Sequence, residues 1–286
     1  MKKMKLLPLV LILVCAGLFA GYNAWDRINT DKNAPEITVG TETIQASVSA
    51  PRSTLLQDVT ATDDRDGDVT DSMVVESIRA LDSKGTVEVT FAAFDQAGNV
   101  AKGTRTVCYT DYQPPRFSLD APLIYAFGTS FDPLATIQAA DVLDGDLNAR
   151  IRAMSMDDNS VSTLGDHQVE FRVTNALGDT TRLTLPVTIY DSETHILTVN
   201  LSRYMIYLKR GSHFDAEQYF ASVNSHLETY AAADLPSEYS LRITGDVNAN
   251  VPGVYPVDYT VTRAQKTSTG TQYTSGFSRL IVIVEG

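Results

Sequence analysis

Hydrophobic and polar residues alternate in short runs along most of the chain from residue 34 onward. Residues 86–94 (TVEVTFAAF) and 255–262 (YPVDYTVT) show the pattern well, because apolar side chains recur at every second position. A period of two, with many β-branched and aromatic residues, is typical of strands that bury one face. The apolar runs RTVCYT, LPVTIY and LIVIVE are each predicted to be the closing strand of a structural unit. Only residues 215–225 and 227–233 hint at helices, and either can be a short turn.

The N-terminus follows a different pattern. Three lysines within residues 1–5 precede seventeen uncharged residues, 6–22 (LLPLVLILVCAGLFAGY), which is the arrangement of an export signal. The spacing of small residues is poor for cleavage, the length is at the lower limit for crossing a bilayer, and Tyr22 and Trp25 stand where interfacial aromatic residues anchor a helix. We therefore expect an uncleaved transmembrane helix that contacts the membrane through residues 6–22 and leaves the C-terminal region outside the cell. A cleaved signal peptide, which would make the protein secreted, is the alternative.

Charge and cysteine content narrow the classes of function. The formal net charge of -12 argues against nucleic-acid binding, which requires a basic surface. The chain has two cysteines, and because Cys15 lies in the apolar N-terminal segment, Cys108 is left without an intrachain partner. The exported region is therefore not a disulfide-stapled scaffold.

Two aspartate-rich stretches reveal an internal repeat. DDRDGDVTD at residues 63–71 is echoed by DVLDGDLN at 141–148, and their first aspartates stand 78 residues apart. Downstream, GTVEVTFAAFDQAGN at 85–99 matches GDHQVEFRVTNALGD at 165–179. Agreement at several spacings indicates duplication of one structural unit.

A third copy has diverged. Residues 252–263 (PGVYPVDYTVTR) have the same glycine-then-alternation form, and GSHFD at 211–215 repeats GTSFD at 128–132. The aspartate motif is missing from this copy, and residues 267–275, rich in Thr, Ser and Gly, predict a longer hairpin loop. The predicted organisation is a membrane anchor or signal at 1–24, followed by repeats at 34–111, 112–191 and 192–286.

The first repeat carries the most complete set of marker residues. In chain order they are Asp63, the triplet DGD at 66–68, Thr70, Gly85, the hairpin DQAGN at 95–99 and RTV at 105–107. This pattern resembles the bacterial immunoglobulin-like repeat of Gram-positive surface proteins, which also occurs in some pesticidal crystal proteins. The resemblance covers residues 34–286 and is weakest in the third repeat. It implies an all-β fold of three tandem immunoglobulin-like antiparallel β-sandwiches after the N-terminal transmembrane helix, and it assigns no activity, because such repeats serve as stalks, spacers and adhesive modules.

The aspartates admit two interpretations. Closely spaced carboxylates in a loop suit a hard cation, so calcium is the sharper hypothesis, with Asp63, Asp66, Asp68, Asp95 and Asn99 as ligands in repeat 1. A weaker equivalent in repeat 2 uses Asp141, Asp144 and Asp146. The alternative is that Asp and Asn side chains cap tight turns by accepting hydrogen bonds from nearby backbone N–H groups.

Catalytic signatures are missing from the sequence. The four histidines, at 167, 195, 213 and 226, show no zinc spacing, and the chain has no GxSxG, P-loop or GxGxxG motif. We therefore expect no enzymatic activity and no required cofactor.

Repeat 3 is the expected site of any ligand contact. It is rich in aromatic residues, most of which are predicted to be core: Tyr204, Tyr207, Phe214, Tyr219, Phe220 and Tyr230. The sequence predicts a non-catalytic, membrane-anchored extracellular protein that acts as a structural stalk or as an adhesion or protein-binding module at the cell surface. The alternatives are a carbohydrate-binding module, secreted or on the surface, and a subunit of a surface complex that binds a protein partner through repeat 3.

Overall fold

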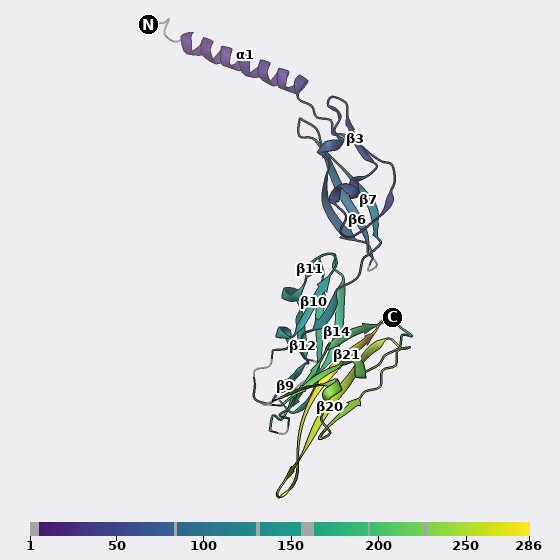
Figure 1. Ribbon diagram of the computed structural model, residues 1–286. Coiled ribbons are helices and arrows are strands. Elements are labelled where there is room, and N and C mark those ends of the chain that lie inside the picture. The colour runs from purple at the N-terminus through teal and green to yellow at the C-terminus, as the bar shows by residue number, and fades with distance from the viewer. Residues whose placement is uncertain (1–5, 83–84, 130–131, 156–162, 194, 226–227) are drawn as a thin grey trace. The chain divides into compact units, whose positions relative to one another are not determined.

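The computed structural model describes residues 6–82, 85–129, 132–155, 163–193, 195–225 and 228–286. These residues divide into two compact units, one ending at Tyr112 and the other running from Gln113 to Gly286 (Figure 1). The N-terminal lysines and His226 lie outside the described residues.

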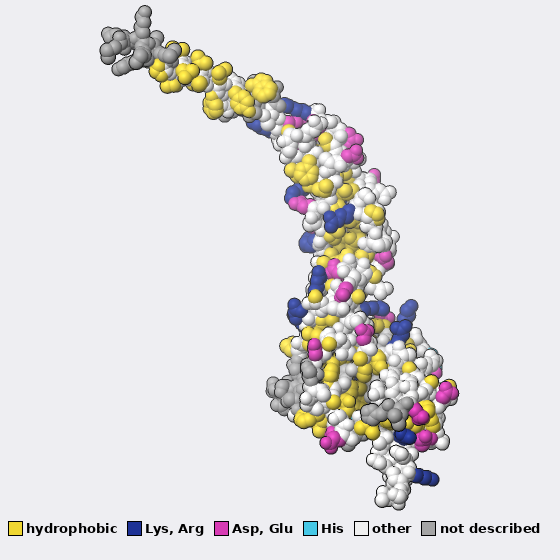
Figure 2. Space-filling view, turned by 60° about the vertical axis from the view of Figure 1, so that its left-hand side comes forward, with side chains coloured by type: hydrophobic (Ala, Val, Ile, Leu, Met, Phe, Trp, Pro, Cys, Tyr) yellow, Lys and Arg dark blue, Asp and Glu magenta, His cyan; other side chains and the backbone are white. Residues whose placement is uncertain are grey.

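Helix α1 (Leu6–Asn29) is the 24-residue element that the apolar N-terminal segment forms. Its apolar side chains are exposed: Leu11, Ile12 and Leu13 each expose 64% of their surface, and Phe19 exposes 70%. Figure 2 shows these hydrophobic side chains along the helix. Across the described part of the chain, no helix is both long and apolar enough to cross a membrane.

Repeat 1 consists of two small sheets. The first has the order β1-β3-β4, and the second β2-β7-β6-β5. Their bounds are Glu36–Val39 (β1), Thr43–Ala46 (β2), Val59–Asp63 (β3), Gly67–Asp68 (β4), Val74–Ala80 (β5), Thr86–Phe94 (β6) and Val100–Tyr109 (β7). Val87, Val89 and Phe91 of β6 are fully buried, as their alternation with polar residues predicts.

Repeat 2 has the same two sheets, ordered β11-β10-β8 and β12-β13-β14-β9. The bounds are Arg116–Leu119 (β8), Ile124–Ala126 (β9), Ile137–Asp141 (β10), Gly145–Asp146 (β11), Arg152–Ser155 (β12), Gly165–Thr174 (β13) and Thr180–Tyr190 (β14). Repeat 3 follows with β15-β17-β18 and β16-β21-β20-β19. Its bounds are Thr198–Leu201 (β15), Met205–Leu208 (β16), Phe220–Asn224 (β17), Thr229–Ala231 (β18), Tyr239–Thr244 (β19), Gly253–Thr267 (β20) and Gly270–Val284 (β21).

Each repeat therefore pairs a three-stranded sheet with a four-stranded one, and this confirms a general immunoglobulin-like β-sandwich. One feature differs from the purely antiparallel prediction. The second strand of every repeat pairs in parallel with the last, as β2–β7, β9–β14 and β16–β21. The reason is that the first strand of each sandwich is interrupted, so its second half crosses to the other sheet and runs beside the closing strand.

In repeat 3 the short-turn alternative to the helical hints is confirmed, and the prediction of a long hairpin loop was wrong. The helical hints become single 3-10 turns, Glu217–Tyr219 and Ala232–Asp234, next to β17 and β18. Residues 267–275 are not a long loop, because β20 and β21 pair continuously up to Thr267 opposite Gly270. The threonines and Tyr273 in this stretch favour strand over loop, and only two residues remain for the turn.

The hydrophobic cores of repeats 2 and 3 are in contact with each other. Met205 and Ile281 of repeat 3 are buried in the same cluster as Phe117, Phe171 and the other core residues of repeat 2. The Tyr207 hydroxyl accepts a hydrogen bond from the Phe117 backbone N–H (3.0 Å) and donates one to its carbonyl (3.2 Å). The two sandwiches therefore form one packed unit.

A buried arginine adds a polar contact to this interface. Arg279 of β21, only 8% exposed, donates to both carboxylate oxygens of Asp258, at 2.5 and 3.1 Å. Its remaining nitrogen reaches across to repeat 2, where it donates to the Thr188 hydroxyl (3.0 Å) and to Asp166 (3.3 Å). Such a charge-assisted network holds the two sandwiches in a defined geometry.

Replacing Arg279 with alanine is expected to lower the free energy of unfolding of the second unit by about 2 kcal/mol, because hydrogen bonds to charged groups are lost at a buried position. Chemical denaturation followed by circular dichroism measures the change. Arg172→Ala, at an exposed arginine of β13, is the matched control and should change stability by less than about 0.5 kcal/mol. Equal effects of the two substitutions would contradict the structural role of Arg279.

Asp166 makes the same interface sensitive to acid. Burial by itself would raise the pKa of Asp166, but the Thr188 hydroxyl and Arg279 outweigh it and hold the pKa below its ordinary value. A carboxyl with a depressed folded-state pKa contributes stability above its unfolded pKa and loses it as pH falls through the folded value. The melting temperature of wild type should therefore exceed that of Asp166→Asn above about pH 5, and the difference should shrink below about pH 4. A difference that stays constant over this range would refute the assignment.

Candidate functional site

The aspartate stretch of repeat 1 forms the turn between β3 and β4. Asp63 ends β3, and its Oδ1 accepts hydrogen bonds from the backbone N–H groups of Arg65 (2.9 Å) and Asp66 (3.0 Å). Gly67 follows with a φ of 74°, a conformation that glycine adopts without strain. The local sequence thus fixes the Asp63 carboxylate at the end of the hairpin and leaves its Oδ2 for another partner.

The DQAGN hairpin between β6 and β7 brings Asp95 to the same end of the repeat. Asp95 Oδ1 accepts from the backbone N–H of Asn99 and Oδ2 from its side-chain amide, both at 2.7 Å. Burial would raise the pKa of Asp95, but the Asn99 amide and the backbone N–H groups of the turn outweigh it and hold the pKa below its ordinary value. Asp95 is therefore an anion at neutral pH.

A third carboxylate comes from the segment between α1 and β1. Asp31 is 9% exposed, and its Oδ1 accepts from the backbone N–H of Asn33 (3.0 Å). The Asn99 amide also donates to the backbone carbonyl of Asp31 (3.2 Å). One carboxylate oxygen from each of Asp31, Asp63 and Asp95 lies within 4.8 Å of the others, and all three residues are buried. These three residues are called the aspartate triad below.

Compensation of the negative charge in the triad is incomplete. The Oδ2 atoms of Asp31 and Asp63 are buried and accept no hydrogen bond from the described residues. The Arg65 guanidinium lies 3.7 Å from Asp31 Oδ2, and its side chain is 48% exposed. Buried charges are normally paired or coordinate a metal, so the donor set fits a hard cation that prefers carboxylate oxygens.

The other predicted ligands of repeat 1 have different roles. Asp66 Oδ2 accepts from the backbone N–H of Gln96 (2.7 Å), which ties the two hairpins together. Asp68 Oδ1 accepts from the backbone N–H of Thr70 (3.0 Å), and hydrogen bonds from Thr70 lower the pKa of Asp68. The structure therefore brings together Asp63 and Asp95, while Asp66 and Asp68 cap turns as the alternative interpretation expects.

Repeat 2 builds the same turns with a different outcome. Asp141 Oδ1 accepts from the backbone N–H groups of Leu143 (3.1 Å) and Asp144 (2.6 Å), as Asp63 does in its own turn. However, the residue equivalent to Asp95 is Asn175, and its amide donates to Asp141 Oδ2 at 2.9 Å. A neutral amide thus donates to Asp141 Oδ2, whereas the equivalent oxygen of repeat 1, Asp63 Oδ2, has no donor among the described residues.

The remaining carboxylates of repeat 2 are also engaged in turns. Asp144 Oδ2 accepts from the backbone N–H of Ala176 (2.6 Å) and from Arg150 (2.7 Å). Asp146 Oδ1 accepts from the backbone N–H of Asn148 (2.7 Å). These contacts favour turn chemistry over metal binding in repeat 2.

Sequence reasoning missed Asp31, because this residue lies before residue 34, where the first repeat was predicted to begin. A signal was present: Asp31, Asp111 and Asp191 recur at intervals of 80 residues, each before the first strand of a repeat. At Asp111 the carboxylate accepts from the Ser47 hydroxyl (2.6 Å) and the Val48 backbone N–H (2.8 Å). The position is thus part of the repeat, and in the first copy it belongs to a group of three carboxylates.

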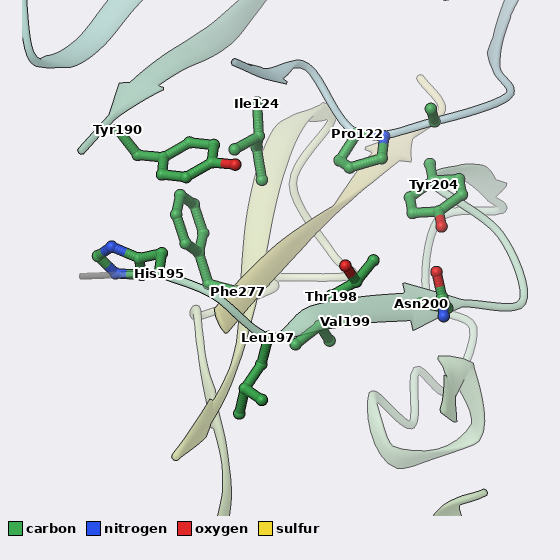
Figure 3. Close-up of a pocket in the computed structure, with 11 residues that line it drawn as sticks. Pro122, Ile124, Tyr190, His195, Leu197, Thr198, Val199, Asn200, Tyr204 and Phe277 are labelled. Carbon is green, nitrogen blue, oxygen red and sulfur yellow. The ribbon is translucent and has the colours of Figure 1, made fainter. Parts of the chain in front are cut away.

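A small pocket of about 300 Å³ lies between repeats 2 and 3. At one end, the rings of Tyr190, His195 and Phe277 contact one another edge to face, with centroids 5.3 to 5.8 Å apart. Figure 3 shows these three rings at one side, with Pro122 and Tyr204 at the other. The cluster joins the last residue of β14 to the following linker and to β21.

The aromatic residues of repeat 3 are mostly used for packing, as the sequence predicted. Phe220 is buried in the core of the repeat, Tyr204 packs against the cores of both repeats, and Tyr207 contacts repeat 2. Phe214 stacks on Tyr219 with centroids 5.9 Å apart. A continuous aromatic binding face is therefore not formed by these residues.

Comparisons with known proteins give limited information. No family model matches the chain. A curated relative from Acholeplasma phage L2, described as an "Uncharacterized 81.3 kDa protein", is 26% identical over 170 residues, which is 56% of this chain. The chain spans 22% of the length of that relative.

Solved structures with some likeness are multidomain β proteins. Mouse cadherin-23 EC22-24 is 14% identical, with 89% of this chain and 99% of that chain covered and a TM-score of 0.21. Protocadherin gammaB7 EC3-6 is 11% identical (88% and 74% covered, TM-score 0.19). The CBM51-2 and INT domains of Clostridium perfringens ZmpB are 14% identical (87% and 44% covered, TM-score 0.22). With such low TM-scores, the assignment of the fold rests on the strand order described above.

Asn175→Asp tests whether the hydrogen bond from the Asn175 amide to Asp141 Oδ2 stabilises repeat 2. The substitution keeps the acceptor oxygen, removes the donor to Asp141 and places two carboxylates together, so it should destabilise the second unit by about 1–3 kcal/mol. Calorimetric melting in the presence of EDTA measures the effect. Asn148→Asp is the control, because the Asn148 side chain accepts from Ala139 (2.8 Å) and the substitution adds the same charge in the same repeat. An equal loss in both variants would show that charge alone is responsible.

Proposed function

We propose that this chain is a non-catalytic protein held at the cell membrane through residues 6–22, with its immunoglobulin-like repeats outside the cell as a structural stalk or a protein-binding module. The observation that carries the proposal is the hydrophobic packing of repeat 3 against the core of repeat 2, which is reinforced by the Arg279 network. A fused pair of sandwiches is a stiff body, and stiffness is the property that a stalk or a presenting module requires.

The engagement of the titratable groups supports a role without catalysis. The aspartates predicted as ligands in both repeats cap turns or belong to the triad, and His167 contacts the backbone carbonyl of Thr163 (2.8 Å). His195 packs edge to face between Tyr190 and Phe277. Acid–base catalysis needs such groups to converge on a space that a substrate can enter, and these groups are instead committed to the fold.

The character of α1 supports the membrane contact. Its apolar side chains from Val10 to Val14 are 50% to 64% exposed, which is unfavourable in water and favourable in lipid. The lysines that precede the helix would stay on the cytoplasmic side. Secretion after cleavage of this segment is the second candidate, and binding of a protein partner or a glycan by repeat 3 stays a prediction.

Leu13→Arg tests the membrane contact. Leu13 lies near the middle of the uncharged segment 6–22, where an arginine disfavours insertion by about 3 kcal/mol. In a bacterial expression host, we expect wild type in the carbonate-resistant membrane fraction and the variant mostly in the soluble fraction.

Leu164→Arg is the matched control, because Leu164 precedes β13 and is 56% exposed. This variant should stay with the membrane as wild type does. Wild type recovered in the medium without residues 1–24 would instead support the secreted alternative.

A further inference from the structure

The aspartate triad assembles three carboxylates from separate parts of repeat 1. Asp63 comes from the β3–β4 turn, Asp95 from the β6–β7 hairpin, and Asp31 from the segment that precedes β1. Asp63 is 8% exposed, and its Oδ2 is buried with no hydrogen-bond donor among the described residues. We propose that the triad binds one Ca²⁺ ion, which fastens the segment of residues 31–33 to the two hairpins of repeat 1.

Repeat 2 supplies the comparison that favours a cation over an ordinary turn. The two repeats share the Asp turn, the glycine and the hairpin. Formation of these turns therefore does not require an aspartate at residue 95. In repeat 2 the equivalent residue is Asn175, whose amide donates to Asp141 Oδ2. Repeat 1 has a second carboxylate in place of this donor, and a bound cation is what would stabilise two such oxygens together.

Nearby protein groups do not replace the ion. Asn99 donates to Asp95 Oδ2 and to the Asp31 carbonyl, so its amide orients two members of the triad without contacting Asp63 Oδ2. The Arg65 guanidinium lies 3.7 Å from Asp31 Oδ2, and its side chain is half exposed. One arginine offsets a single charge of the three.

The chemistry of the donors selects the class of ion. All three ligand groups are carboxylates, which suit hard cations, whereas zinc sites are typically built with histidine or cysteine. Ca²⁺ accepts irregular sets of six to eight oxygens, and Mg²⁺ requires a near-ideal octahedron. A site assembled from two hairpins and a connecting segment is irregular, which favours Ca²⁺.

The position of Asp31 defines what the ion would do. Asp31 follows α1 by two residues, and the segment is otherwise held by single hydrogen bonds such as that from the Asn33 amide to Asp64 (3.0 Å). A cation shared by Asp31, Asp63 and Asp95 would make the start of the repeat as firmly held as its sheets. The site depends only on repeat 1, so its test is independent of the proposed membrane contact.

The experiment is an isothermal titration of the EDTA-treated full chain with CaCl₂, together with melting curves in Ca²⁺, Mg²⁺ and EDTA. Wild type should bind one Ca²⁺ per chain and melt several degrees higher with Ca²⁺ than with EDTA. Asp95→Asn should lower the affinity at least 100-fold. In EDTA this variant should melt at or above the wild-type temperature, because an amide at residue 95 can donate to Asp63 as Asn175 does to Asp141.

Asp66→Asn is the matched control. It makes the same charge change in the neighbouring turn and keeps an acceptor for the Gln96 backbone N–H, so Ca²⁺ affinity should stay within about threefold of wild type. Hydrogen exchange should slow with Ca²⁺ at residues 31–33, 63–66 and 95–99 and stay unchanged at 141–144 and 175–179. Absence of binding by wild type, undiminished binding by Asp95→Asn, or tighter binding of Mg²⁺ than of Ca²⁺ would overturn the proposal.

Discussion

A buried polar atom needs a partner, and much of this structure depends on how each repeat meets that requirement. In repeat 2 the Asn175 amide donates a hydrogen bond to Asp141. At the interface of repeats 2 and 3, Arg279 donates hydrogen bonds to Asp258, Thr188 and Asp166. Leaving such an atom unpaired costs more than the paired hydrogen bond contributes, so these contacts select one arrangement among many compact ones. The triad of repeat 1 is one of the places where buried polar atoms have no hydrogen-bond partner among the described residues, and it is the one where two carboxylate oxygens lack a donor together.

Because the repeats arose by duplication, they share one fold while the polar side chains at equivalent hairpins differ. All three repeats keep the three-stranded and four-stranded sheets and the parallel pair that closes the sandwich. The pairing of the strands therefore fixes the backbone of the hairpins, and single side chains at the hairpin ends can change without altering it. Asp95 and Asn175 differ by an oxygen and an amide nitrogen, yet one makes an anionic group and the other a closed hydrogen-bonded turn.

The strands and turns were predictable because their signals are local. Alternation in residues 86–94 marks β6, and the DQAGN hairpin places Asp95 next to the turn that begins at Asp63. Asp31 was not predicted, since no local pattern separates it from a polar spacer. The interface of repeats 2 and 3 was missed for the same reason: Arg279 lies in an apolar closing strand, and its partner Asp166 is 113 residues away in the chain.

The β20–β21 hairpin has a consequence for how this protein can be handled. Residues 265–267 pair only with 270–272, and among the described strands no third one covers either edge of this ribbon. Open edges can recruit other chains, but the ribbon is polar, carries Lys266 and ends in a tight turn, features that discourage such association. Its tip contributes no residue to the hydrophobic cores of repeats 2 and 3, so it is a natural position for inserting an epitope or a fluorophore attachment site without disturbing them.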